Sequence, residues 1–586
     1  MRSKTVTFLK QTVWLGIAVL LVLGVGIGNS LACKEKEKKH FPLTVHTKYG
    51  VVKGYYNTEE TAAWKSVPFA KPPVGDLRWK APQDPQHWRG VLDATQECEP
   101  CAQLKTDTNW GKEPVMVGSE DCLYLDIYRP KHMTGFLPVY VYFHGGANHF
   151  GGKSDYDGSV IAAKSQMVVV IVQQRLGPLG WFTHAALRHG ESDLDDSGNY
   201  GTLDNIKALE WIHKNIWAFG GNPFNVTITG ESAGAHNVMN MVISPLAKNL
   251  FHKAMSESGG MVTKTVEEGE AMAELIIDRI LTMAGLSREA WNNMTLEEQE
   301  AFLRGLDAGQ IWLPIIYDVP LMTFDAFEDG VVVPGSVTAT IRSGNYNKVP
   351  IILGANKSEM KAFMPLYGPL LTQQSGINIP WINLIGVLQG YFPLDYVLPT
   401  EFDKKLYQVS GYYGSRNWRA KFVDERARAL ADQQSNVYAY QFNWGEPGSG
   451  PTPFDFIYGA LHTLDIPFFF GADSDIWGYA FTPDTDTAGR QALRDAMMKY
   501  LANFARTGNP NGKGMPQWEQ WSNSNGAAKA IVLDADMTQA KIGMSSEEVS
   551  IAAEQYKLAM EIATWTQLQQ AMYGWVPWAF QWQTAE

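Results

Sequence analysis

The feature that most constrains the fold is the pentapeptide Gly230–Gly234, Gly-Glu-Ser-Ala-Gly, which stands between a strand pattern and a helix pattern. The preceding residues Asn225–Thr229 place Val226 and Ile228 on one side, as in a short strand. The two glycines allow a turn so sharp that a Cβ atom at either position would strike a neighbouring element. This context predicts Ser232 at the strained tip of a strand–turn–helix elbow, with its hydroxyl facing the carboxyl end of a sheet. The alternative is a plain glycine-rich turn before a helix.

Strand and helix patterns alternate along the chain, which predicts an α/β fold with a large, mostly parallel central sheet flanked by helices. Further strand-like runs lie at Leu137–Phe143, Met167–Val172, Val349–Leu353 and Val437–Phe442. Helical patterns lie at Leu203–Phe219 and Gln491–Arg506. The helix-rich stretch Glu267–Leu306 is expected as an insertion over the sheet, on the side of the site.

Length and charge narrow the class of protein. The 586 residues exceed the usual size of one domain, but no repeat and no linker divides the chain, so we predict a single domain over residues 43–586. The composition, 45% hydrophobic and 19% charged, is that of a globular protein. The net charge of −12 argues against nucleic acid as a partner, because phosphate binding needs a basic face.

The N-terminal residues 1–32 have the pattern of a signal peptide. Basic residues at Arg2, Lys4 and Lys10 precede the apolar run Val13–Ile27, and Ser30–Ala32 places small residues at a cleavage site. We therefore expect a secreted or periplasmic protein. A retained anchor is the alternative, although the apolar run is short for a membrane span.

Residues 33–42 are expected as a charged tether, because lysine and glutamate alternate after Cys33. Cys33 directly follows the small residue Ala32, as the lipid acceptor of a lipoprotein does, so lipidation would attach the protein to a membrane. Ser30 stands where the lipoprotein motif usually has leucine, which argues for cleavage without lipidation.

The four cysteines are too few for a disulfide-rich scaffold or a zinc array, and no metal site is expected. Export permits disulfides. Cys101 and Cys122 are 21 residues apart and could close a loop worth about 3 kcal/mol. Cys98 then has no predicted disulfide partner, unless it competes for the same cysteine.

A second loop is a candidate oxyanion hole. The strand pattern Leu137–Phe143 ends in His-Gly-Gly-Ala, residues 144–147. We predict that the N–H groups of Gly146, Ala147 and Ala233 stabilise the negative charge that develops on a carbonyl oxygen during acyl transfer. A hairpin turn is the alternative. His144 is expected to be structural.

A serine nucleophile needs a histidine base and an acid that orients it. Of the 12 histidines only His236, His252 and His462 follow Ser232. His236 would lie in the helix that the elbow starts, and His252 follows too soon for further strands to intervene. Elimination leaves His462 as the base.

The acid is expected between Ser232 and His462, just after a strand, because the order serine, acid, histidine is usual for such an elbow. Glu359 follows the strand pattern that ends near Leu353 and is our choice. Asp329, in a glycine-containing loop, is the runner-up, and Asp465 fails the order rule.

The chain resembles the type-B carboxylesterase/cholinesterase family of the α/β-hydrolase superfamily from about residue 43 to about residue 540. The motifs that carry the resemblance are Ser119–Leu125, His144–Gly146, Gly198–Gly201, Ala218–Pro223, Gly230–Gly234 and Phe504–Asn511. The resemblance implies an α/β-hydrolase fold and a serine esterase that acts on small-molecule carboxylic esters without metal or organic cofactor.

The resemblance also bears on individual residues. It supports Ser232, Glu359 and His462 as a catalytic triad and implies a Cys101–Cys122 disulfide. Glu231 matches a family position thought to tune the pocket electrostatically.

The sequence departs from the family pattern at several positions. Ala147 replaces the third glycine of the oxyanion loop and adds a methyl group to the pocket wall. Trp110 lies near the position of the choline-binding tryptophan, but its spacing to Cys122 differs, which puts choline-ester specificity in doubt. The C-terminal segment beyond the resemblance carries four tryptophans, Trp565, Trp575, Trp578 and Trp582.

Four alternatives to a carboxylesterase remain open. These are a lipase, an amidase, a choline-ester hydrolase and a non-catalytic cholinesterase-like binding protein.

Overall fold

The computed structural model describes residues 40–105, 115–133, 135–190, 192–315, 323–365, 380–476, 478–567 and 569–571. Contacts divide the chain into two units, Met1–Phe41 and Pro42–Glu586, and the architecture below is that of the second unit. The expected signal peptide and Cys33 lie outside the described residues, as do Trp110, Trp575, Trp578 and Trp582.

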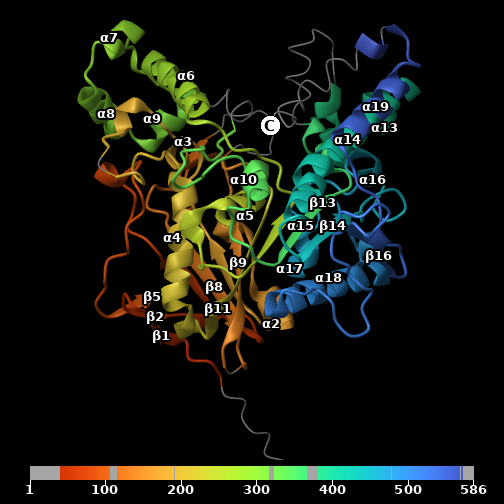
Figure 1. The fold of residues 1–586 in the computed structure, drawn as a ribbon, viewed down its shortest axis with the longest axis horizontal. Coiled ribbons are helices and arrows are strands. Elements are labelled where there is room, and N and C mark those ends of the chain that lie inside the picture. The colour runs from red at the N-terminus through yellow and green to blue at the C-terminus, as the bar shows by residue number, and fades with distance from the viewer. Residues whose placement is uncertain are drawn as a thin grey trace, which may run out of the picture. The chain divides into compact units, whose positions relative to one another are not determined.

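An eleven-stranded mixed sheet forms the centre of the second unit (Figure 1). Its order is β16-β15-β14-β13-β12-β11-β9-β10-β8-β4-β3, and the seven strands from β15 to β10 in this order run parallel to one another. The parallel strands are β9 (Leu137–Phe143), β10 (Val168–Val172), β11 (Gly221–Glu231), β12 (Lys253–Glu257), β13 (Ile351–Asn356), β14 (Val437–Phe442) and β15 (Ala530–Ala535). The antiparallel edge strands are β3 (Tyr55–Tyr56), β4 (Thr61–Pro68), β8 (Tyr124–Pro130) and β16 (Ala540–Ser545).

The middle of this sheet is buried on both faces. Every residue of β10 is fully buried, as its unbroken run of valine and isoleucine predicts for a central parallel strand. Two small sheets accompany the large one and are made of β1 (Thr44–His46), β2 (Val51–Lys53) and β5 (Val91–Asp93), and of β6 (Gln103–Lys105) and β7 (Val115–Val117).

Helices pack on the sheet in two groups, as expected for an α/β fold. One group consists of α2 (Ser159–Ser165), α17 (Ile466–Phe470) and α18 (Ala488–Thr507). The other consists of α4 (Tyr200–Asn215), α5 (Ala233–Ile243), α10 (Val337–Ser343) and α15 (Arg426–Ala431). Short helices α3 (Gly177–Gly180) and α16 (Phe454–Ile457) lie in connections.

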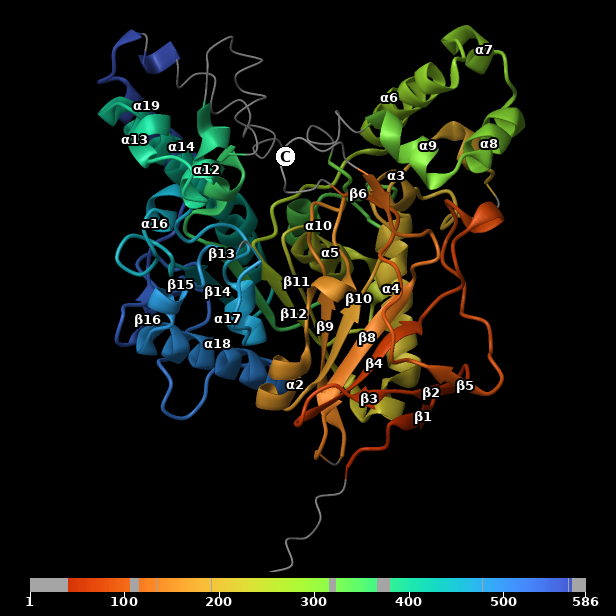
Figure 2. The ribbon, with the colours of Figure 1, turned by 180° about the vertical axis from the view of Figure 1, so that it is seen from behind.

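Two helical insertions follow the carboxyl ends of β12 and β13. The first consists of α6 (Val266–Ala284), α7 (Arg288–Asn292), α8 (Leu296–Gly305) and α9 (Ala308–Trp312) and contains the expected stretch Glu267–Leu306. The second consists of α12 (Leu384–Leu388), α13 (Leu394–Val397) and α14 (Glu401–Arg419), and α19 (Ile551–Ile562) packs on α14. Figure 2 shows the first insertion above one half of the sheet and the second above the other half. No helix in the described ranges is both long and apolar enough to cross a bilayer.

Several expected boundaries were displaced. β11 begins earlier and ends later than Asn225–Thr229, so the strand runs to the residue before Ser232. The expected helix Leu203–Phe219 ends at Asn215, and a 3₁₀ turn continues to Phe219 before Gly220 adopts a left-handed φ of 74°. β13 begins at Ile351 and not at Val349, because Pro350 has no N–H group to pair in the sheet.

A buried ion pair ties the chain after β10 to α4. Asp204 Oδ2 accepts from Arg175 Nε at 2.8 Å, and Oδ1 accepts from the Arg175 Nη2 group at 2.7 Å. The same carboxylate accepts the backbone N–H of Arg175 at 3.0 Å. Both side chains are almost completely buried, so water cannot replace either partner.

Removal of one partner from this pair should destabilise the fold strongly. Asp204→Asn is expected to lower the free energy of unfolding by about 3–5 kcal/mol, because Arg175 keeps a buried charge without its counter-ion. The control Asp495→Asn breaks a half-exposed contact with Lys164 at 3.8 Å and should cost less than about 1 kcal/mol. Denaturant unfolding of both variants measures the difference, and equal losses would contradict this role for the pair.

Candidate active site

Ser232 stands at the sharp turn between β11 and α5. Its backbone has φ 59° and ψ −125°, a strained conformation for a residue with a side chain. A Cβ atom on Gly230 would lie 2.6 Å from the carbonyl oxygen of Phe143, and one on Gly234 would lie 2.0 Å from the same oxygen. Ser232 is half-buried, whereas Glu231 and Ala233 are buried, so the turn presents the serine toward the outside.

The close contact between the elbow and β9 predicts that a side chain at Gly234 destabilises the fold. Gly234→Ala should lower the free energy of unfolding by about 3 kcal/mol, because the new methyl group meets backbone that cannot move without shifting β9. The control Gly543→Ala, in β16, has no atom within 4 Å of the added methyl group and should be near neutral. Chemical unfolding compares the two variants. An unchanged free energy of unfolding in Gly234→Ala would contradict the close fit of the turn against β9.

The loop after β9 touches the elbow. β9 pairs with β11 in parallel, with Phe143 opposite Gly230, so both strands end at the same level. A Cβ atom on Gly145 would lie 3.2 Å from Ser232 Cβ. Gly146 and Ala147 both adopt left-handed φ angles, 94° and 54°, which turn the loop back over the elbow.

Three backbone N–H groups at this junction are unused. Within the described ranges, the N–H groups of Gly146, Ala147 and Ala233 donate to no acceptor. His144 holds the loop from within: it is completely buried, its Nδ1 lies 2.9 Å from the carbonyl oxygen of Gly145, and burial lowers its pKa. The junction can therefore receive an oxygen that carries negative charge.

Glu359 and His462 meet at the carboxyl ends of β13 and β14. Glu359 follows β13 in a 3₁₀ turn, and its Oε1 accepts the backbone N–H of Asn356 at 2.6 Å. Its Oε2 lies 2.5 Å from His462 Nδ1. Both side chains are buried, and β13 and β14 are parallel neighbours, which explains how residues 103 positions apart come together.

The other imidazole nitrogen points toward the elbow. His462 Nε2 has no hydrogen-bond partner among the residues that the structure describes, and it lies 3.2 Å from Oε1 of Glu231, the residue before Ser232. Phe363 and Trp418 pack against the imidazole, with ring centroids 5.1 and 5.2 Å away. The ring is thus held by packing and by Glu359, and one nitrogen is left for chemistry.

The rejected histidines have other surroundings. His236 is completely buried in α5, where burial lowers its pKa to about 3. His252 accepts the backbone N–H of Val226 through Nδ1 at 3.2 Å, near the start of β12.

The rejected acids are also engaged elsewhere. Asp329 Oδ1 accepts backbone N–H groups from residues 331 to 333 and so caps a turn. Asp465 accepts the hydroxyl of Tyr440 at 2.6 Å and the amide of Asn356 at 3.2 Å, which places it beside Glu359 without a bond to His462.

Buried carboxyl groups crowd the region behind His462. Burial, then the nearby Asp465, Glu359 and Glu257, raises the pKa of Glu231 well above its ordinary value. Burial and Asp465 also raise the pKa of Glu257, whose Oε1 accepts the Thr229 hydroxyl at 2.6 Å. Burial raises the pKa of Asp465 to about 6. Several of these groups therefore hold a proton where a surface carboxylate would not.

The raised pKa of Asp465 links folding stability to pH. Because its folded pKa of about 6 lies above the ordinary 3.8, ionisation of Asp465 opposes folding, and this penalty grows as pH rises from about 3.8 to about 6 and is constant above that range. Asp465→Asn removes the ionisable group. The free energy of unfolding of the variant, relative to that of the wild type, should increase by up to about 3 kcal/mol from about pH 4 to about pH 7.5. Urea unfolding at both pH values measures this change, and a pH-independent difference would contradict it.

A disulfide joins Cys101 to Cys122, with the Cα atoms 5.0 Å apart. Cys98 is a half-buried free thiol, and burial raises its pKa.

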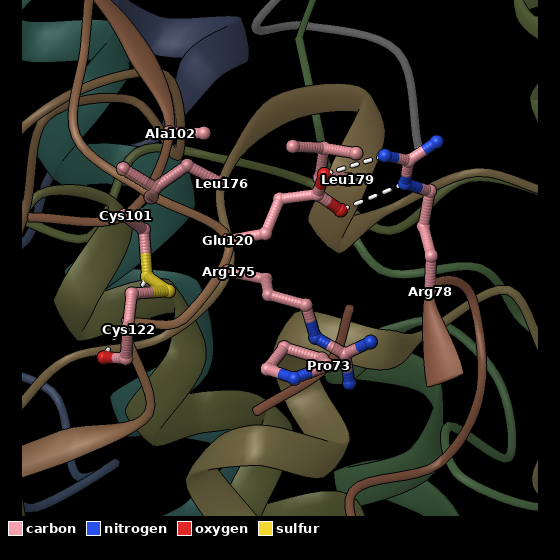
Figure 3. A pocket seen from close by; sticks show the side chains of 9 residues that line it. All are labelled: Pro73, Arg78, Cys101, Ala102, Glu120, Cys122, Arg175, Leu176 and Leu179. Carbon is pink, nitrogen blue, oxygen red and sulfur yellow. Dashed lines mark hydrogen bonds and ion pairs between the residues drawn. A yellow bond between two sulfur atoms is a disulfide. The ribbon is translucent and has the colours of Figure 1, made fainter. Parts of the chain in front are cut away.

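A small cavity adjoins this disulfide (Figure 3), and its lining residues are Pro73, Arg78, Cys101, Ala102, Glu120, Cys122, Arg175, Leu176 and Leu179. Its charged members are already paired, as in the two bonds between Arg78 and Glu120. This cavity includes no candidate catalytic residue.

No group of three or more His, Cys, Asp or Glu side chains in the described part of the chain is arranged to hold a metal ion.

Comparison with solved structures defines the class of protein. A carboxylesterase from Geobacillus stearothermophilus superimposes with a TM-score of 0.67 at 27% sequence identity, over 88% of this chain and 99% of that one. The large mixed sheet flanked by helices is that of an α/β-hydrolase, as the sequence predicts.

The family follows from the sequence comparisons. The profile of the carboxylesterase family matches residues 42–376 and 399–552. The medium-chain fatty acyl-CoA hydrolase precursor of Anas platyrhynchos is 34% identical over 89% of this chain and 92% of its own length. Carboxylesterase 1D of Rattus norvegicus is 32% identical over 88% of this chain and 93% of its own length. The chain belongs to the carboxylesterase family, and it is a carboxylic ester hydrolase.

Proposed function

We propose that this protein is an exported serine carboxylesterase that hydrolyses small-molecule carboxylic esters through an acyl-enzyme on Ser232. The observation that supports this most strongly is the buried contact of 2.5 Å between Glu359 and His462, with the free Nε2 of His462 directed at the elbow that carries Ser232. A buried imidazole with one nitrogen anchored and the other unpaired is suited to move a proton.

The proposed reaction has two halves. In the first, His462 Nε2 takes the proton of the Ser232 hydroxyl as its oxygen attacks the ester carbonyl, and then gives that proton to the departing alcohol. In the second, the same nitrogen activates a water that releases the acid and regenerates the serine. Glu359 holds the Nδ1–H of the imidazole in place and stabilises the imidazolium that forms in each half.

An oxyanion forms in each half of the reaction, and we assign its stabilisation to the N–H groups of Gly146, Ala147 and Ala233. They come from the loop after β9 and from the first residue of α5, and Gly145 brings that loop against Ser232. A donor without a partner in the free protein can form a new bond to developing charge without giving up an old one.

Glu231 is assigned an electrostatic role in its neutral form. An ionised carboxylate 3.2 Å from His462 Nε2 would hold the imidazole as a cation and leave it unable to accept the serine proton. Burial and the neighbouring carboxyl groups raise the pKa of Glu231 well above its ordinary value, which favours the neutral form and leaves His462 free to act as a base. Trp110 remains a candidate for the substrate pocket.

Export is proposed from the signal-peptide pattern of residues 1–32, followed by the tether at residues 33–42 and one hydrolase domain over residues 43–586. The Cys101–Cys122 disulfide supports an oxidising compartment. Lipidation at Cys33 would keep the enzyme at a membrane surface, and cleavage without lipidation would release it.

The central prediction concerns ester hydrolysis by residues 33–586. Ser232→Ala should lower kcat/KM for 4-nitrophenyl esters by at least about 10³-fold, because the nucleophile is lost. Glu359→Gln should lower it by about 10³–10⁴-fold, since the amide cannot fix the imidazole in the same state. The control Ser165→Ala, at a buried serine of α2, should leave it unchanged.

A panel of short and long acyl chains, choline esters and fatty acyl-CoA thioesters, assayed spectrophotometrically, would separate the carboxylesterase proposal from a lipase or a choline-ester hydrolase. Equal rates for the wild type and Ser232→Ala would rule out the assigned nucleophile. A wild type without activity on every ester would favour the non-catalytic binding protein.

A further inference from the structure

An indole donor without a partner lies beside the proposed base. Trp418, near the end of α14, is 3% exposed, and its Nε1–H has no hydrogen-bond partner in the described part of the chain. Buried indole N–H groups usually pair, because an unsatisfied donor is unfavourable in a dry interior. A donor in this state is ready for an acceptor that the free protein does not supply.

The surroundings of Trp418 place it in the wall of the proposed active site. Its ring lies 5.2 Å from the ring of His462, and 5.9 Å from that of Phe363 in a stacked arrangement. A Cβ atom on Gly260 would lie 1.9 Å from Trp418 Cζ2 and 2.7 Å from Cε2, the carbon bonded to Nε1. The absence of a side chain at Gly260 therefore makes room for the edge of the indole next to its nitrogen.

The loop that meets the indole also meets the elbow. This loop, residues 257–260, accepts the backbone N–H of Ser232 at the carbonyl oxygen of Glu257, at 2.9 Å. A Cβ atom on Gly259 would lie 3.2 Å from Ala235 Cβ in the first turn of α5. The end of β12 and the residues that follow it thus contact both Ser232 and Trp418, and the ring of His462 also packs against the indole.

We propose that Trp418 is a specificity residue, whose Nε1–H donates a hydrogen bond to an oxygen of the substrate other than the two oxygens of the reacting ester group. This proposal rests on the proposed function. The substrate class is an ester with an ether, carbonyl or hydroxyl oxygen within a few bonds of the reacting carbonyl, in preference to an ester of hydrocarbon chains alone. A substrate without such an oxygen would leave the indole donor buried and unpaired during the reaction.

Another tryptophan supplies a matched control. Trp211, in α4, is 1% exposed and also has an unpaired Nε1, but it packs against Phe219 and contacts none of Ser232, His462 and Glu359 in the described structure. The lack of a partner alone therefore does not mark a substrate contact, and the contact with His462 singles out Trp418.

Pairs of esters that differ by one oxygen in place of one methylene test the proposal. For the acyl side the pair is 4-nitrophenyl methoxyacetate and 4-nitrophenyl butyrate, and for the alcohol side it is 2-methoxyethyl butyrate and butyl butyrate. The measured quantity is the ratio of kcat/KM within each pair, for the wild type, Trp418→Phe and Trp211→Phe. Comparison of variants on the same pair cancels the different intrinsic reactivity of the esters.

The expected result is a ratio at least about fivefold higher in the wild type than in Trp418→Phe for one of the two pairs, with no change in Trp211→Phe. The pair that responds shows whether the oxygen belongs to the acyl or the alcohol part. Unchanged ratios for both pairs, with active enzymes, would overturn the role of Trp418 and leave the proposed function intact. A wild type that hydrolyses none of these esters would remove the proposed function and the inference together.

Two further measurements guard against a variant that fails to fold. Trp418→Met fills the space with an adaptable apolar side chain and also lacks the N–H group, so it should give the same ratios as Trp418→Phe. The wild type alone must favour the oxygen-bearing member of one pair about fivefold beyond the ratio of the hydroxide-catalysed rates. A wild-type preference no larger than the chemical ratio in both pairs would overturn the inference without any variant.

Discussion

The contact between Glu359 and His462 is the interaction on which the proposed chemistry depends. It forms because β13 and β14 are parallel neighbours and end at the same edge of the sheet, where Asn356 holds one carboxylate oxygen and the other meets the imidazole. The elbow of Ser232 ends β11 at the same edge, and the loop after β9 lies against it. A parallel sheet thus gathers groups that are far apart in the sequence.

The setting of this contact is dry and rich in carboxyl groups. Burial and mutual repulsion raise the pKa of Glu231, Glu257 and Asp465. Protonation of these carboxyl groups removes the charge that a counter-ion would otherwise have to neutralise. In the proposed reaction, a neutral Glu231 leaves His462 unprotonated and able to accept a proton. The same crowding implies a cost in folding stability at neutral pH, located at the proposed active site.

Much of this arrangement could be predicted from local sequence. The glycines on either side of Ser232 predict the elbow because the clash that a side chain would cause is a local consequence of the turn. The position of Glu359 was predicted from chain order and a strand end. The predicted start of β13 was wrong by two residues because Pro350 has no N–H group to pair in the sheet. The predicted β11 was too short because residues 221–223 are glycine, asparagine and proline, which are uncommon in strands.

Other features could not be read from one sequence. Trp418 contacts the site only through long-range packing, and nothing in the residues around it indicates a role. Asp465 was rejected as the acid by chain order, but its hydrogen bond to Asn356 depends on the tertiary structure. Glu257 lies in β12, whose burial depends on both neighbouring strands, so its raised pKa has no local signal in the sequence. The raised pKa values of these carboxyl groups and the unpaired N–H group of Trp418 arise only when the tertiary structure brings distant side chains together.

The most direct test of the central claim is to locate the acyl-enzyme. The wild type is incubated with a slowly released 4-nitrophenyl carbamate or with an organophosphonate ester, and the adduct is mapped by peptide mass spectrometry. We expect one adduct per chain, on the peptide that contains Ser232, and none in Ser232→Ala. An adduct on a different serine, or hydrolysis of esters without any trappable adduct on Ser232, would contradict it.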